Sequence, residues 1–302
     1  MPDQLLQRHV PQAAIGQRPA PADPAYERAP RVRIMGVEIA AVTEADAVRE
    51  IVGAAEARRG HWTITANLDH LRRYRRNPVE RALIDQADLV VADGMPLVWA
   101  SRLAGGSLPE RVAGSRMIWS ICEAAGARRQ SIFLLGGDPG VAERAAAILT
   151  RTYPTLPVAG IACPPVGFEQ NARELAQIRR QLVRAEPQIV FVALGFPKQD
   201  LLIRGLRESL PGTSFVGVGI SLSYVTKDVS PAPAWVCRAG MEWAYRLFQE
   251  PARLVRRYLV QGLPFALRLM SSSAWHRLAR RIRGESAGWG SVEESTSPPS
   301  RA

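Results

Sequence analysis

A chain of 302 residues can form one large hydrophobic core or two small ones, and 47% hydrophobic with 22% charged residues is the composition of an ordinary soluble globular protein. Three widely spaced cysteines without a CxxC pair argue against a disulfide framework and a thiolate zinc site and suit a reducing compartment, and the absence of any run of 18 apolar residues argues against a transmembrane helix. The net charge of +11 is unusual and indicates an anionic partner: nucleic acid, an acidic membrane surface or a phosphorylated small molecule.

The two ends of the chain differ in composition from the part between them. Residues 1–30 are rich in Pro, Ala and Gln, show no periodicity and lack the apolar core of a signal peptide, so they predict a disordered extension. Residues 284–302 predict a disordered tail for the same reasons. Between these ends we expect an α/β domain over 31–234 and a helical appendage over 235–283.

Between the ends, short apolar runs alternate with helix signals. In chain order we expect a strand or hairpin at 31–40, a helix at 43–60, a strand at 61–68, a short helix from 77, a strand at 87–92, a helix at 116–127, a strand at 131–137, a helix at 139–151, a strand at 157–162, a helix at 170–185, a strand at 187–195, a helix at 196–210 and a strand at 214–221.

Several helix ends carry specific capping signals. Thr43 is a predicted N-cap with Asp46 placed as in a capping box, and Gly60 stands at the far end of that helix. Pro78 is expected at the tolerated first position of a short helix, and Ser115 is a candidate cap for the helix that follows it.

Apolar runs that do not alternate, separated by helices, are typical of a mostly parallel sheet covered on both faces. The predicted fold class is therefore α/β, a Rossmann-like doubly wound sheet followed by a basic amphipathic helical appendage. In such folds ligands bind beyond the carboxyl ends of the strands. The residues that close predicted strands are Thr65, Asn67, Asp93, Gly136, Gly137, Gly195, Gly217 and Gly219.

Two of these strand ends have candidate phosphate or substrate groups. The loop "LLGGDPG" (134–140) could bring a phosphate to backbone N–H groups and a helix N-terminus, although it lacks GxGxxG and the Lys-Ser/Thr of a P-loop, and a tight turn is an equal alternative. "ALGFPKQD" (193–200) offers the charge of Lys198 and the amide of Gln199; a solvated helix start is the alternative.

The remaining polar candidates also have plain structural alternatives. Thr65 and Asn67 alternate at a strand end, as sugar hydroxyls would require, although Asn there often only forms a turn. Asp93-Gly94 is either a turn or a carboxylate aimed into a cleft, and Arg111 is either a diphosphate ligand or a surface ion-pair partner. The sequence has no Asp-x-Asp pair to hold a divalent ion, so a departing diphosphate would need positive side chains and helix N-termini.

The appendage carries most of the net charge. Residues 238–283 contain ten arginines against two glutamates, which is +8 of the total +11, and their aromatic and aliphatic residues recur at near-helical spacing. Such a segment can lie in the interface of an anionic membrane leaflet. Packing on the core as a helical pair, or formation of an oligomer interface, is the alternative.

The ordered set of motifs resembles the WecG/TagA/CpsF glycosyltransferases, glycosyltransferase family 26, over roughly residues 32–262. The segments that carry the resemblance are TANLDH, ADLVVADGMP, PERVAGSR, FLLGGDPGVAERAA, CPPVGFE, ALGFPKQD, GVGIS and AGMEWAYRLFQEPARLVRRYL. The resemblance implies a Rossmann-like enzyme at the cytoplasmic face of the cell membrane in bacterial surface polysaccharide assembly. It would transfer N-acetylmannosamine, its uronic acid or glucose from a UDP-sugar to an undecaprenyl-diphosphate-linked saccharide.

The resemblance also implies residue roles. It makes Asp93 the general base of an inverting displacement and places Thr65, Asn67, Arg111 and Gln199 against substrate. It implicates Arg253, Arg256 and Arg257 of the appendage in holding the diphosphate. We expect the glycine loops and Lys198 to bind the nucleotide, and the scheme needs no metal and no cofactor.

Three positions depart from the family pattern. Ser223 stands where Asp is common, Pro231 where Arg is common, and Asp200 turns the usual "KQE" into "KQD". These departures leave open a catalytically silent, membrane-bound scaffold as one alternative. A basic nucleic-acid-binding protein is another, although no nucleic-acid motif is recognised.

Overall fold

The computed structural model describes residues 30–238, 240–249 and 251–283, so both predicted disordered ends lie outside the described residues. The described part begins with an antiparallel hairpin, β1 (Arg31–Ile34) and β2 (Val37–Ala40), in which Arg31 lies opposite Ala40. The expected strand or hairpin is therefore a hairpin.

Six strands form the central sheet, and every adjacent pair in it is parallel. Their order across the sheet is β4-β3-β8-β7-β5-β6. This confirms the predicted Rossmann-like α/β fold. The strands are β3 (His61–Ala66), β4 (Leu89–Ala92), β5 (Ile132–Gly136), β6 (Val158–Ala162), β7 (Ile189–Ala193) and β8 (Ser214–Gly217).

Helices cover both faces of the sheet, and successive strand residues belong alternately to two hydrophobic clusters. Val90 packs in the first cluster, whereas Leu89 and Val91 pack in the second. The first cluster includes residues of α3 (Leu68–Arg76), α4 (Pro78–Gln86), α5 (Met95–Leu103), α8 (Ala172–Ala185) and α9 (Lys198–Leu206). The second includes residues of α2 (Glu44–Glu56), α6 (Gly114–Ala127), α7 (Val141–Thr152) and α10 (Ser221–Val225).

The predicted helix caps have different outcomes. The capping box of α2 is confirmed, because Thr43 Oγ1 accepts from the Asp46 N–H at 3.2 Å and Asp46 Oδ2 accepts from the Thr43 N–H at 3.0 Å. Pro78 is the first residue of α4, as expected. The prediction for Ser115 is wrong, because α6 begins one residue earlier and has no side-chain cap.

Two of the helices that were not expected from the sequence follow β3 and β4 closely. One is α3, which begins directly after β3 with Asn67 as its N-cap, and the other is α5, which begins one residue after Gly94. Both follow strand ends that the sequence marked as turns. The chain therefore enters a helix immediately beyond β3 and almost immediately beyond β4, so backbone N–H groups point at the edge where ligands are expected.

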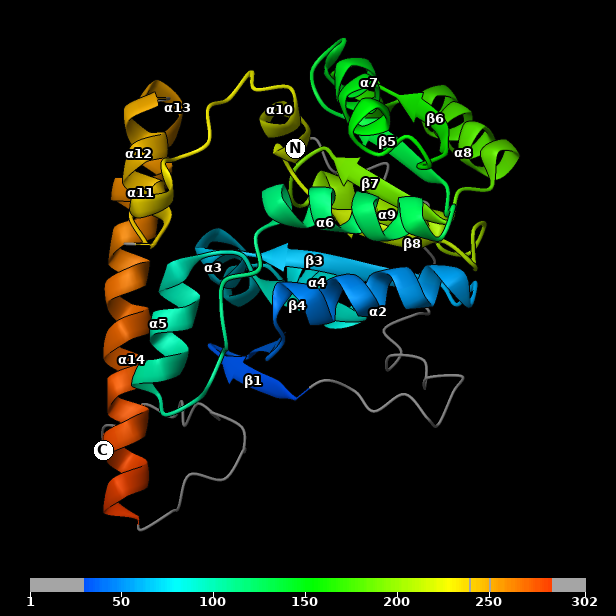
Figure 1. Ribbon diagram of the computed structural model, residues 1–302. Helices are drawn as coiled ribbons and strands as arrows, with labels where there is room; N and C mark the ends of the chain where they lie inside the picture. The colour runs from blue at the N-terminus through cyan, green and yellow to red at the C-terminus, as the bar shows by residue number, and fades with distance from the viewer. Residues whose placement is uncertain (1–29, 239, 250, 284–302) are drawn as a thin grey trace.

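The appendage is helical, as predicted, and it packs on the sheet domain. Its elements are α11 (Ala234–Arg238), α12 (Glu242–Gln249), α13 (Pro251–Val255), the π-helical η2 (Arg256–Gly262) and α14 (Leu263–Ile282). Figure 1 shows α14 running alongside α5, and Leu269 of α14 is buried in the first cluster. The domain boundary near residue 235 stays a prediction. Within the described residues, no helix has the length and apolar character that crossing a membrane requires.

One of the buried carboxyl groups, Asp200, packs against the sheet. Asp200, in the first turn of α9, is fully buried, and its Oδ1 accepts from Trp62 Nε1 of β3 at 3.2 Å. Burial raises the pKa of Asp200 to about 7, although hydrogen bonds from Trp62 and Gln199 lower it. A carboxyl group with such a pKa is substantially protonated near neutral pH.

Thr43→Ala should lower the free energy of unfolding by about 1 kcal/mol, because it removes the acceptor for a first-turn N–H of α2. For a domain of this size the midpoint of thermal unfolding should fall by roughly 2–4 °C. The matched control Thr43→Ser keeps the oxygen and should stay close to wild type. An equal loss in both variants would contradict the capping explanation.

Asp200→Asn should make stability less dependent on pH. The folded-state pKa lies above the unfolded value of 3.8, so the folded protein binds this proton more tightly, and the wild type loses stability as pH rises from about 4 through 7. Asn keeps an acceptor for Trp62 but cannot ionise. In urea unfolding, the free energy of unfolding of the variant should equal that of the wild type near pH 4 and exceed it by roughly 2–4 kcal/mol at about pH 8. The same stability difference at both pH values would refute this account.

Candidate functional site

Parallel register brings the predicted site residues to one edge of the sheet. Ala66 pairs with Ala92, Ile64 and Val192 both flank Gly217, and Gly136 pairs with Ala193, so five strands end close to level with one another. The residues just beyond these pairs are those that the sequence singled out. The carboxyl edge of β4, β3, β8, β7 and β5 is thus the candidate site.

Asp93 directly follows β4 and lies between two backbone segments. Its N–H donates to the carbonyl of Ala66 at 2.7 Å, which ties it to the end of β3. Its Oδ2 accepts from the N–H of Gly114, the first residue of α6, at 3.4 Å. The carboxylate therefore occupies the N-terminus of α6, where a helix favours negative charge. This also explains why Ser115 is not needed as a cap.

The environment of Asp93 makes it a stronger base than an ordinary aspartate. Although the residue keeps partial exposure, burial of its carboxyl group raises the pKa to about 6. Arg111 opposes the rise, Glu242 adds to it, and the Gly114 N–H and Arg246 oppose it. The net result is a carboxylate that is ionised at neutral pH and binds a proton more tightly than usual.

Arg111 reaches the site from the loop between α5 and α6. The next residue, Val112, donates its N–H to the carbonyl of Ala92 at 2.9 Å, which fixes this loop against the end of β4. The Arg111 guanidinium forms an ion pair with Glu242 of α12. Burial disfavours its charge, but Glu242 and Asp93 favour it more, and the pKa of Arg111 is raised.

Helix α12 presents two charged side chains to this edge. Glu242 and Arg246 are four residues apart and so lie on the same face of the helix. The Arg246 guanidinium lies 5.8 Å from the ring centroid of Tyr224 in α10. The hydroxyl of Tyr224 is buried and has no hydrogen-bond partner among the described residues, and burial raises its pKa to about 12. Sequence reasoning missed Glu242, Arg246 and Tyr224.

Thr65 and Asn67 lie at this edge, as predicted, and each already has a structural partner. Thr65 Oγ1 donates to the carbonyl of Gly217 at 3.0 Å and so links β3 to β8. Asn67 caps α3, with its Oδ1 accepting from the N–H of Asp69 at 3.0 Å. A β-carbon on Gly94 would lie 3.9 Å from that of Asn67, so Asn67 adjoins the Asp93-Gly94 turn.

Gln199 is brought together with two of the predicted glycines. Its side chain is buried, and its Oε1 accepts from the N–H of Gly219 at 3.2 Å. A β-carbon on Gly217 would lie 2.5 Å from Gln199 Nε2, so a larger residue at 217 would displace this amide. Lys198, one residue earlier, forms an ion pair with buried Glu169 of the short helix η1 (Phe168–Gln170).

In the glycine-rich loop after β5, part of the backbone is already packed against, or hydrogen-bonded to, the end of β7. Gly136 has φ +102°, and a β-carbon there would lie 2.5 Å from the carbonyl oxygen of Ala193, so only glycine fits. The Gly137 N–H donates to the same carbonyl at 2.9 Å, so this N–H already has a hydrogen-bond partner at the end of β7. Gly195 follows β7 and accepts from the Gln199 N–H through its carbonyl at 3.0 Å. The nucleotide-binding role of these glycines stays a prediction.

The remaining predicted residues lie in or near the appendage. Arg256 is exposed in η2, and the side chains of Arg253 and Arg257 lie outside the described part of the structure. Of the family departures, Ser223 is in α10 beside Tyr224, and Pro231 is exposed in the segment that leads to α11. The appendage residues that the structure places next to Asp93 are therefore Glu242 and Arg246.

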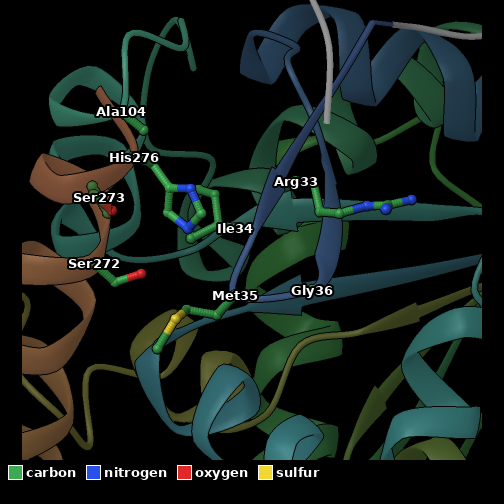
Figure 2. A pocket seen from close by; sticks show the side chains of 9 residues that line it. Arg33, Ile34, Met35, Gly36, Ala104, Ser272, Ser273 and His276 are labelled. Carbon is green, nitrogen blue, oxygen red and sulfur yellow. The ribbon is translucent and has the colours of Figure 1, made fainter. Parts of the chain in front are cut away.

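A separate pocket lies away from these residues, between the hairpin turn, α5 and α14. Figure 2 shows Ser272, Ser273 and His276 of α14 facing this pocket, with Met35 of the hairpin turn on another side. Ala104, at the end of α5, lines the pocket on that side. It is nine residues beyond Met95, so the pocket lies roughly 13 Å along the helix from the end of α5 that is next to Asp93. Its lining includes none of the predicted site residues.

The edge around Asp93 combines a base of raised pKa, a helix N-terminus and two arginines, and this set suits proton removal next to an anionic group. In the described ranges, no three His, Cys, Asp or Glu side chains gather as a metal site.

Comparison with known proteins identifies the family. Residues 32–279 match the Glycosyl transferase WecG/TagA/CpsF family. Two similar proteins are each named N-acetylglucosaminyldiphosphoundecaprenol N-acetyl-beta-D-mannosaminyltransferase. One, from Bacillus spizizenii (strain W23), is 31% identical over 195 residues, which is 65% of this chain and 74% of the relative. The other, from Bacillus subtilis (strain 168), is 31% identical over 174 residues, which is 58% of this chain and 66% of the relative. The chain belongs to the WecG/TagA/CpsF family of glycosyltransferases, as its ordered motifs predict.

Proposed function

We propose that this chain is an inverting transferase that moves a sugar from a UDP-sugar to a saccharide carried on undecaprenyl diphosphate, in the synthesis of a bacterial surface polysaccharide. The observation that carries the proposal is Asp93, a carboxylate of raised pKa, next to Arg111 at the strand ends. The names of the two relatives support an acceptor of this class and N-acetylmannosamine as the sugar. Its uronic acid and glucose stay alternative sugars.

In the proposed mechanism, Asp93 takes the proton from the acceptor hydroxyl as that oxygen attacks the anomeric carbon of the donor. The bond from the anomeric carbon to the UDP oxygen breaks in the same step, and the configuration at that carbon inverts. A pKa of about 6 suits this role, because the group is ionised at neutral pH yet still binds the arriving proton. A positioned base typically contributes 10²–10⁴-fold to the rate.

The departing UDP needs its charge stabilised. Arg111 and Arg246 both interact electrostatically with Asp93, so we assign them to the diphosphate together with Arg256. The N-termini of α7 and α9, next to the glycine loops and Lys198, are assigned to the nucleotide. Thr65, Asn67 and Gln199 are assigned to the sugars.

We further propose that the appendage holds the protein at the inner face of the cell membrane, where the lipid-linked acceptor is. Of the 15 large hydrophobic residues that are exposed among the described residues, 12 lie between 235 and 282. They share this segment with most of the net positive charge. Exposed apolar residues among arginines are typical of a helix in the interface of an anionic leaflet.

Asp93→Asn should lower turnover by roughly 10²–10⁴-fold, because an amide cannot accept the proton. The assay is UDP release from UDP-N-acetylmannosamine with undecaprenyl-diphosphate-linked N-acetylglucosamine as acceptor. UDP binding and the thermal unfolding midpoint should stay near wild type. The wild-type enzyme should lose kcat/KM as pH falls through about 6, since protonation removes the base. Full turnover by the variant would rule out Asp93 as the base.

Phe248→Glu and Trp275→Glu should each weaken flotation with anionic phospholipid vesicles by about tenfold or more, the scale expected when a large apolar side chain no longer inserts. Both side chains are strongly exposed, at 86% and 67%. Val166→Glu is the matched control, because Val166 is at least as exposed but lies outside the appendage. Flotation that is unchanged in all three variants would disprove the membrane role of this surface.

A further inference from the structure

Glu242 is the acidic side chain that the appendage brings to the site. Its carboxylate forms an ion pair with Arg111 across 131 residues of sequence, and Cys237 Sγ lies 3.8 Å from the same carboxylate oxygen. Neither charged partner is fully exposed, with side-chain exposures of 16% for Arg111 and 21% for Glu242. Nothing in the proposed transfer step uses this carboxylate, so its pairing with Arg111 and its influence on Asp93 require an explanation.

We propose that Glu242 is a positioning residue of the transfer reaction: through its ion pair it fixes the Arg111 guanidinium whose charge acts on Asp93. This inference rests on the proposed roles of Asp93 and Arg111. It assigns to α12 a function in the reaction that is separate from membrane attachment.

The first argument concerns the orientation of Arg111. An arginine side chain has several rotatable bonds, and fixing them costs free energy that a partner must offset. The Glu242 carboxylate accepts a hydrogen bond from one terminal nitrogen of Arg111, Nη1. The guanidinium has five N–H donors in a planar fork. Most of the donors therefore remain for a ligand, while the plane of the fork is already set.

The second argument concerns charge. Among the described residues, the groups that interact electrostatically with Asp93 are Arg111 from the α5–α6 loop, Glu242 and Arg246 from α12, Tyr224 from α10, and the Gly114 N–H of α6. Among these groups Glu242 has the charge that makes proton binding by Asp93 more favourable. It also screens the arginines, which alone would make Asp93 a weaker base. Glu242 thus favours proton acceptance from the sugar hydroxyl.

Glu242→Gln tests the inference, because glutamine is close in shape but carries no charge. Removal of the negative charge should lower the pKa of Asp93, so the acid limb of kcat/KM should move down by roughly one pH unit. Near pH 8 kcat should fall roughly three- to tenfold, because a weaker base accelerates proton transfer less. Glu242→Asp keeps the charge, so the acid limb of its kcat/KM profile should stay at the wild-type pH. Glu208→Gln changes an exposed residue of the sheet domain and is the surface control.

A purely structural role for Glu242 predicts a different result. Both Glu242 variants would then lose activity together, with the acid limb in its wild-type place, and the inference would be overturned. Asp93→Asn in the same assay separates the two claims. If it kept turnover, the proposed base would be wrong; if it lost turnover while Glu242→Gln kept the wild-type limb, the inference about Glu242 alone would fail.

Discussion

The shared direction of the six central strands is the constraint on which the site depends. Because neighbouring strands are parallel and in register, Ala66, Ala92, Ala193 and Gly217 stand near one line, and the chain beyond each strand must emerge at the same edge. An antiparallel neighbour would bring the start of a strand to this edge instead. Asp93 and Thr65 therefore meet because of backbone hydrogen bonds, before any side chain contributes.

Two aspartates, Asp200 fully buried and Asp93 partly exposed, show how the surroundings tune one residue type. Burial raises the pKa of both, to about 7 for Asp200 and about 6 for Asp93. The hydrogen bonds that lower the pKa of Asp200 come from neutral groups, among them Trp62 and Gln199, whereas the positive charges of Arg111 and Arg246 act on Asp93. The cationic neighbours keep Asp93 ionised at neutral pH and leave it with more than ordinary basicity. Asp200 behaves as a structural carboxyl, and Asp93 has the properties of a base.

The sequence was sufficient for the strands and for the residues that close them, because apolar runs and glycines are local signals. It was insufficient for α3, whose sequence LDHLRRYRR has too few apolar residues to form a recognisable stripe, and for α5, whose MPLVWASRL is apolar on most sides. Glu242 was missed for another reason. Its partner Arg111 is 131 residues away, and no local pattern encodes a contact of that range.

The appendage reaches the candidate site because of where Gly240 lies. Its φ is +71°, and a β-carbon there would lie 2.5 Å from the ring of Trp99, so the backbone rests directly on α5. Gly240 lies two residues before Glu242, the first residue of α12, and α5 itself begins two residues after Asp93. Helix α5, which follows Asp93, is thus in contact with Gly240, and α12, which follows Gly240, is paired with Arg111 through Glu242. If the exposed face of the appendage binds membrane more tightly when α12 is docked, linkage requires that membrane binding favour the docked, complete site by the same free energy.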